Sequence, residues 1–342
     1  MILYFIAYLL KILHGPNVSS MGTPVRGKMV ASETKIDLQL PFWVMCFLFS
    51  LLLPSVCFGE KLPIVSSIYP VADMVRQVGG AHVDVTVVLP AGASPHTFEP
   101  KPSMVKKFSS ARIFFMIGAG LEFWAEKFVR LSDPNLVTVV LSEGISLVHT
   151  LEHHDDHEHL LGKTDDSGGE AQMANPHIWL DPAIAKLMVN KITASLSKVD
   201  RGHVKYYQFR GQMYLDELDR LDRHISKTIE SFSNKKYVSF HASWVYFARR
   251  YGLEPVGVIE ASPGRNPSPV QIKRIVDRIK KHRIQSIFAE PQLNPKVAEV
   301  IAKEAGVRML VLDPMGGPKL PGRSSYVDLM NYNLNVLQEA MK

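Results

Sequence analysis

Cysteine is almost absent from this chain: among 342 residues there are only two, Cys46 and Cys57, and both lie in an apolar segment near the N-terminus. A domain that begins at Glu60 therefore contains no cysteine. This absence excludes a fold held by disulfides and a metal site built from clustered cysteine pairs. Such a domain must depend on its hydrophobic core and on whatever ligand it binds.

Other features are also missing. Apolar residues make up 46% of the chain, which is ample for sizeable cores but too low for a polytopic membrane protein. Beyond residue 59 the sequence has 35 basic and 31 acidic residues, a net charge of +4, with no basic stripe interleaved with aromatic residues. This pattern argues against a nucleic-acid partner. No HExxH helix and no serine nucleophile elbow is present.

The N-terminal region carries a targeting signal. Residues 41–58 are strongly apolar, are too short for a convincing transmembrane span, and follow Lys28 and Lys35. We therefore expect a Sec-type signal peptide, with cleavage before Glu60 and export to the periplasm. Lipid attachment at Cys57 is the less favoured alternative, because the preceding residues lack leucine at −3 and a small residue at −1.

A second apolar stretch, residues 1–13, precedes this signal. A signal peptide that begins some forty residues into a chain is unusual. We expect an over-extended reading frame whose true start is Met21 or Met29, although a genuine N-terminal anchor is the other interpretation.

From residue 60 onward, short apolar strands alternate with segments of helical periodicity, in two series. The strands expected in the first series are 63–68, 83–89, 111–117 and 136–141, and those in the second are 235–240, 255–260, 285–290 and 307–312. This alternation predicts parallel βαβ units, in which ligands bind beyond the carboxyl ends of the strands.

A long helix is predicted between the two series, over 200–232. Its apolar residues follow the three-and-four spacing of one helix face: Leu215, Leu218, Leu221, Ile225 and Ile229. A helix of this length would span about 45–50 Å. Gly211, near its start, is expected to bend or weaken it.

Four residues have the chemistry and placement of metal ligands. His96, His241 and Asp313 each follow a predicted strand, and His177 lies in the Asn-Pro-His-Ile-Trp-Leu-Asp-Pro segment. Neutral imidazole and carboxylate suit a borderline cation such as Zn²⁺. One such histidine alone is more often a satisfied polar residue. Glu290 is a rival carboxylate, with hydrogen bonding to a ligating histidine as its expected role.

A His-rich segment interrupts the first series. Residues 149–172 contain few apolar side chains, so they are expected to form a disordered surface loop. Its four clustered histidines are His153, His154, His157 and His159. They form either an auxiliary set of weak zinc sites or a solvated linker without a function.

Five segments, in order, resemble one family: HTFEPKPS, NPHIWLDP, SFHASWVYFARRYGL, FAEPQLNP and VLDPMGG. From about Lys61 to the C-terminus the chain is similar to the metal-binding solute-binding proteins of ABC importers, of the zinc (ZnuA-like) type. The resemblance implies two α/β lobes with parallel sheets joined by one long rigid helix. It also implies a non-enzymatic, monomeric protein that captures Zn²⁺ in the interlobe cleft and delivers it to an ABC permease.

The resemblance also implies roles for particular residues. His96, His177 and His241 would be ligands, with Asp313 or water in the fourth position. Manganese members of the family have a carboxylate where this chain has His241, which favours zinc. A disulfide that is common in the second lobe of zinc members is absent. The expected divisions are an extension with signal peptide (1–59), an N-terminal lobe (60–199), a linking helix (200–232) and a C-terminal lobe (233–342).

Two alternatives stay open. One is a manganese-binding relative or an adhesin of the same family. The other is a zinc hydrolase, in which three histidines and an open position would activate water and Glu290 would act as the general base.

Overall fold

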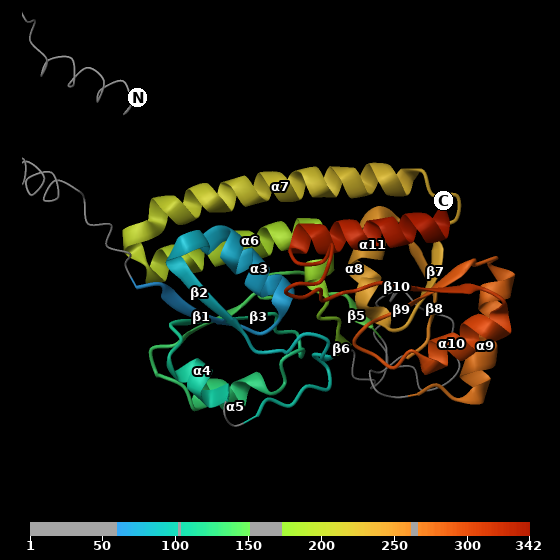
Figure 1. Ribbon diagram of the computed structural model, residues 1–342, viewed down its shortest axis with the longest axis horizontal. Helices are drawn as coiled ribbons and strands as arrows, with labels where there is room; N and C mark the ends of the chain where they lie inside the picture. Colours follow the sequence, from blue (N-terminus) through green and yellow to red (C-terminus); the bar gives the residue numbers. More distant parts are fainter. Residues whose placement is uncertain (1–59, 102–103, 151–172, 261–265) are drawn as a thin grey trace, which may run out of the picture. The chain divides into compact units, whose positions relative to one another are not determined.

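The computed structural model describes residues 60–101, 104–150, 173–260 and 266–342. Within them lie two four-stranded sheets whose strand pairs are all parallel (Figure 1). The first has the order β2-β1-β3-β4, formed by β1 (Leu62–Ser66), β2 (Val83–Val87), β3 (Ile113–Met116) and β4 (Val137–Val140). The second has the order β10-β9-β7-β8, formed by β7 (Lys236–Ser239), β8 (Glu254–Val258), β9 (Ser286–Ala289) and β10 (Arg308–Val311). The predicted fold class is confirmed.

Both sheets are covered by helices on two faces. The first sheet packs α4 (Val105–Ser109) and α5 (Ala125–Arg130) against one face, and α3 (Tyr69–Gly79) and α6 (Pro182–Val199) against the other. The second packs α9 (Pro269–Lys281) and α10 (Lys296–Ala305) against one face, and α8 (Val245–Tyr251) and α11 (Tyr326–Met341) against the other. Burial on both faces explains why the strands read as continuous apolar runs.

Local signals in the sequence fix the ends of several helices. Asp181 accepts a hydrogen bond from the backbone N–H of Ala183 at the start of α6, directly before Pro182. Ser268 and Gln271 form a reciprocal capping box at the start of α9. Helix α8 ends at Gly252, whose φ of 70° is in the left-handed region.

The long helix α7 (Val204–Glu230) links the two halves. Its 27 residues span about 40 Å, and it packs against α3 and α6 as well as α8 and α11 (Figure 1). It is shorter than the predicted 200–232 at both ends: Arg201–His203 form a separate 3-10 turn, and the helix ends at Glu230. At this end the His203 ring stacks on His82, with centroids 3.7 Å apart.

Gly211 permits a close approach between α7 and α6. A Cβ atom at this buried position would lie 2.5 Å from Thr193 Oγ1 of α6. The glycine is therefore required by the packing of two helices, a role that its sequence context did not predict.

The structure differs from the expectation at the start of the predicted His-rich loop. His149–Thr150 form β5, which pairs antiparallel with β6 (Met173–Ala174), so its first two residues are a short strand and not part of a loop. Histidines 153, 154, 157 and 159 lie outside the described residues, as do Cys46, Cys57 and the predicted signal peptide. Among the residues that are described, no helix is long and apolar enough to cross a membrane.

One hydrophobic cluster extends across both sheets. It contains Ile64 and Phe115 of the first sheet, Phe288 of the second, and Trp179 and Tyr326 between them. The two halves therefore share a continuous core beneath α7, which opposes a wide hinge motion between them.

Candidate metal centre

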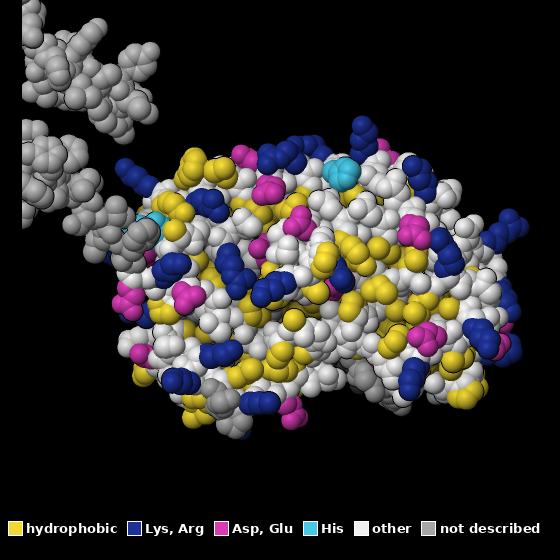
Figure 2. Space-filling view, viewed as in Figure 1, with side chains coloured by type: hydrophobic (Ala, Val, Ile, Leu, Met, Phe, Trp, Pro, Cys, Tyr) yellow, Lys and Arg dark blue, Asp and Glu magenta, His cyan; other side chains and the backbone are white. Residues whose placement is uncertain are grey.

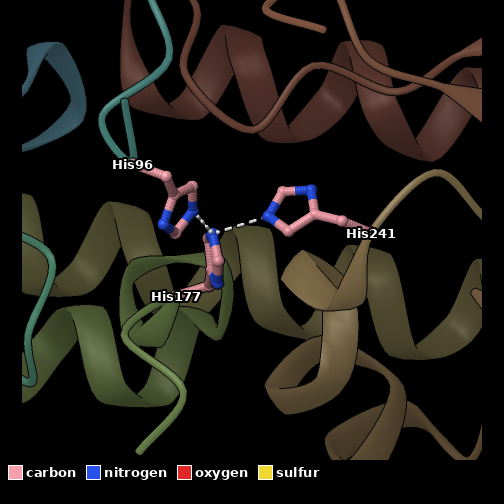
Figure 3. A group of neighbouring side chains, drawn as sticks. All are labelled: His96, His177 and His241. Carbon is pink, nitrogen blue, oxygen red and sulfur yellow. Dashed lines mark hydrogen bonds between the residues drawn. The ribbon is translucent and has the colours of Figure 1, made fainter. Parts of the chain in front are cut away.

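Three histidine side chains meet at one point (Figure 3). The Nε2 atom of His177 lies 3.1 Å from Nε2 of His96 and 3.1 Å from Nε2 of His241. In the described part of the chain, these three side chains have ligand atoms that all lie within 4.8 Å of one another, close enough to share one metal ion. Residues separated by up to 145 positions in the sequence are thus brought together.

The fold delivers each histidine from a different segment. His96 lies in the loop that follows β2, and His241 follows β7 and precedes the 3-10 turn Ala242–Trp244. His177 follows β6 and precedes the 3-10 turn Ile178–Leu180. Two of the three therefore lie beyond the carboxyl ends of parallel strands, where ligands of such sheets bind.

The spacing of the nitrogen atoms fits a small tetrahedral cation. With Zn–N bonds of about 2.0–2.1 Å, two ligands of a tetrahedral ion are about 3.3–3.4 Å apart. The two separations of 3.1 Å are slightly smaller, so only a small outward shift of the rings is needed. When the proton of each ring is on Nδ1, the three Nε2 lone pairs repel one another, and a divalent cation between them removes that repulsion.

Neighbouring groups define the ring orientation at two of the histidines. His177 Nδ1 lies 3.0 Å from Asn175 Oδ1. His241 Nδ1 lies 3.0 Å from Glu290 Oε1, an ion-pair distance, although its alignment is too poor for a hydrogen bond. Ser243 donates a 2.6 Å hydrogen bond to the same Glu290 oxygen. A carboxylate beside the Nδ1 edge favours a proton there, which leaves Nε2 for a metal.

Burial keeps two of these imidazoles neutral. It lowers the pKa of His96 to about 3, with a smaller contribution from the charge of His241. It also lowers the pKa of His177 well below its usual value, and the charges of His241 and His96 add to this. Both rings are consequently uncharged at neutral pH, with one nitrogen free to bind a metal.

Asp313, the fourth residue predicted from the sequence, is fully buried just after β10, but it does not join the histidine cluster. Its Oδ1 accepts hydrogen bonds from the backbone N–H groups of Met315 and Gly316 and from Gln292 Nε2, at 2.9–3.0 Å. Its Oδ2 lies 3.1 Å from Arg323 Nη1. The carboxylate thus has partners on both oxygens.

Sequence reasoning missed the residues that hold the His177 segment in place. Trp179 Nε1 donates to the carbonyl of Pro314, and Tyr326 donates its hydroxyl to the carbonyl of Trp179, at 2.8 and 2.7 Å. Arg250 of α8 forms ion pairs with Asp181 and with Asp222 of α7. The Asn-Pro-His and Trp-Leu-Asp-Pro motifs mark this segment in the sequence. They do not indicate which residues, distant in the sequence, form contacts with it.

The comparisons with known proteins agree with this geometry. The family model for "Zinc-uptake complex component A periplasmic" matches residues 64–340. The high-affinity zinc uptake system protein ZnuA of Bacillus subtilis is 29% identical over 83% of this chain and 88% of its own. The zinc-binding protein AdcA of Streptococcus pyogenes is 29% identical over 81% of this chain, which spans only 56% of that longer relative.

Solved structures show the same fold. A crystal structure of ZnuA is 28% identical, with a TM-score of 0.72, covering 83% of this chain and all of that one. The laminin-binding protein Lmb of Streptococcus agalactiae, described as having adhesin and metal transporting activity, is 28% identical, with a TM-score of 0.69, covering 82% of this chain and 99% of that one. The family is one of transport components, which confirms the prediction that the chain is not an enzyme. From residue 64 to residue 340, this chain belongs to the ZnuA family, the zinc-binding periplasmic components of ABC zinc-uptake systems.

Proposed function

We propose that this protein captures one Zn²⁺ ion between the Nε2 atoms of His96, His177 and His241 and delivers it to an ABC permease. The observation that carries the proposal is the convergence of three imidazole nitrogens, two of them on rings that burial keeps neutral. Three nitrogen ligands suit zinc better than manganese, which prefers carboxylate oxygens and a higher coordination number.

The fourth ligand is either water or Asp313. To ligate the ion directly, the carboxylate of Asp313 must break its ion pair with Arg323 or its hydrogen bonds from Gln292 and from the backbone N–H groups of residues 315 and 316. Water completes the tetrahedron if the carboxylate stays with these partners. Asp313 remains our candidate for the direct ligand, and Asp313→Ala is expected to weaken binding less than loss of a histidine, because water replaces a carboxylate more easily.

Delivery should require only a small movement of the lobes. We take residues 60–199 and 233–342 as the two lobes and 200–232 as their link. His96 and His177 precede the link and His241 follows it, so a slight separation would lengthen bonds on opposite sides of the ion. The shared core and α7 oppose a wide opening, so the free energy for opening the site would have to come from binding to the permease.

We propose that the protein acts as a monomer in the periplasm.

The role of the His-rich segment also belongs to this proposal. The four histidines of residues 153–159 would bind additional zinc weakly, because a chain segment loses conformational entropy when it becomes ordered around an ion. Deletion of residues 153–159 should leave the tight site intact and remove the weak ones.

A second candidate function rests on the likeness to Lmb, a protein described as both an adhesin and a metal transporter. Charged side chains of both signs are scattered over the face seen in Figure 2, and we find no feature there that selects a host protein. Transport of metal is therefore the primary proposal.

The test is metal binding by protein purified without an affinity tag. Metal content distinguishes zinc from manganese, and competition against a chromophoric chelator gives the affinity. His96→Ala, His177→Ala and His241→Ala should each remove tight binding. Wild-type affinity in any of these variants would exclude that residue from the site.

A further inference from the structure

Asn175 makes an unusual set of contacts beside the histidine cluster. Its side chain is buried, and its Oδ1 lies 3.0 Å from both the backbone N and the ring Nδ1 of His177. Its Nδ2 donates a 2.7 Å hydrogen bond to the carbonyl of Ala242, and its own carbonyl accepts one of 2.7 Å from the Tyr246 hydroxyl. Ala242 is the residue directly after His241. Asn175 thus touches the segments that carry two of the three histidines.

The orientation of this amide follows from its neighbours. The backbone N–H of His177 can only donate, so it faces the oxygen, and the carbonyl of Ala242 can only accept, so it faces the nitrogen. An amide oxygen cannot donate, and therefore His177 Nδ1 must carry a proton to hydrogen-bond with it. In a neutral ring this leaves the lone pair on Nε2, the atom that faces His96 and His241.

We propose that Asn175 is a positioning residue for the metal site, and this inference rests on the proposed function. Its amide holds His177 in the tautomer that presents Nε2 to the metal, and it ties that ring to the segment that carries His241. His177 precedes α7 in the sequence and His241 follows it, so the amide connects the two βα series directly. They form a preset pair, to which His96 is added from the loop after β2.

The chain supplies a matched control for this role. Asn234 also accepts a hydrogen bond from the backbone N–H two residues ahead, Lys236, at 3.0 Å, and donates to a distant carbonyl, that of His282, at 3.3 Å. No metal-binding histidine ring takes part in that arrangement. A comparison of the two positions separates the general cost of losing a bridging amide from an effect on the metal site.

The experiment measures two quantities for the full chain. One is zinc affinity by competition with a chromophoric chelator, and the other is the tautomer of His177 in zinc-free protein, from imidazole ¹⁵N chemical shifts. Asn175→Ala should reduce zinc affinity about 10- to 100-fold and remove the preference for the Nδ1–H form. Asn175→Asp should keep that tautomer and restore part of the affinity, since a carboxylate accepts both N–H groups but cannot donate to Ala242. Asn234→Ala should lower the unfolding midpoint with affinity unchanged.

Three results would overturn the role of Asn175: wild-type affinity in Asn175→Ala, equal losses of affinity in Asn175→Ala and Asn234→Ala, or loss of the Nδ1–H tautomer in Asn175→Asp. The third result tests the role of Asn175 even if Asn175→Ala does not fold. The variant His177→Ala tests the proposed function separately, because tight zinc binding in that variant would show that the three histidines are not the zinc site.

Discussion

Acidification should destabilise the zinc-free protein through His96. The pKa of this imidazole is lowered to about 3 in the folded protein by burial, whereas it is about 6.5 in an unfolded chain. The unfolded state therefore binds a proton that the folded state does not. The stability present above about pH 6.5 is consequently lost as the pH falls from 6.5 toward the folded value.

The size of the effect follows from linkage. At pH 5 the unfolded imidazole is about 1.5 pH units below its pKa, while the folded ring is still neutral, and each unit corresponds to about 1.4 kcal/mol. Between pH 7 and pH 5, His96 should account for about 2 kcal/mol of the fall in the free energy of unfolding. His177, whose pKa is also lowered by burial, adds in the same direction.

The assay is urea unfolding in the presence of a chelator, at pH 7 and pH 5. His96→Gln should lose about 2 kcal/mol less than wild type over this interval. His224→Gln, at an exposed position on α7, is the control and should keep the wild-type pH dependence. Equal pH dependence in His96→Gln and wild type would show that His96 is protonated as easily in the folded as in the unfolded chain, which would contradict the desolvation of its ring in the cluster.

Three further predictions follow from contacts around the site. Gly211→Ala should cost about 1–3 kcal/mol of unfolding free energy by overpacking, and Thr193→Ala in the same chain should remove most of that cost, both measured by urea unfolding. Arg250→Met should cost about 2 kcal/mol in the same assay, because Asp222 loses a charged hydrogen-bond partner. Glu290→Gln should weaken zinc binding about tenfold in chelator competition, because the carboxylate beside His241 Nδ1 is lost.

Local apolar patterns in the sequence were enough to predict the strands of both sheets and the long helix. Strands that are buried on both faces are continuous apolar runs, and one face of α7 repeats every three or four residues from Leu218 to Ile229. These are local patterns, so a single sequence shows them. The tight packing at Gly211 depends on Thr193, which lies on another helix, and no local pattern records it.

The histidines of the site were predicted for a similar reason. Each lies beyond a strand or beside proline, and the family resemblance connected them across the chain. The hydrogen bonds and the ion pair of Asp313 could not be predicted from the sequence, because the positions of Arg323 and Gln292 follow no spacing rule. The contact of Asn175 with Ala242 likewise depends on how distant segments pack.

Anomalous diffraction at the zinc edge, from crystals of the zinc-loaded protein, tests the central claim most directly. We expect one strong peak about 2.0–2.1 Å from the Nε2 atoms of His96, His177 and His241. A zinc peak bonded to other residues, or no peak among these three rings in protein that contains one equivalent of zinc, would contradict the account.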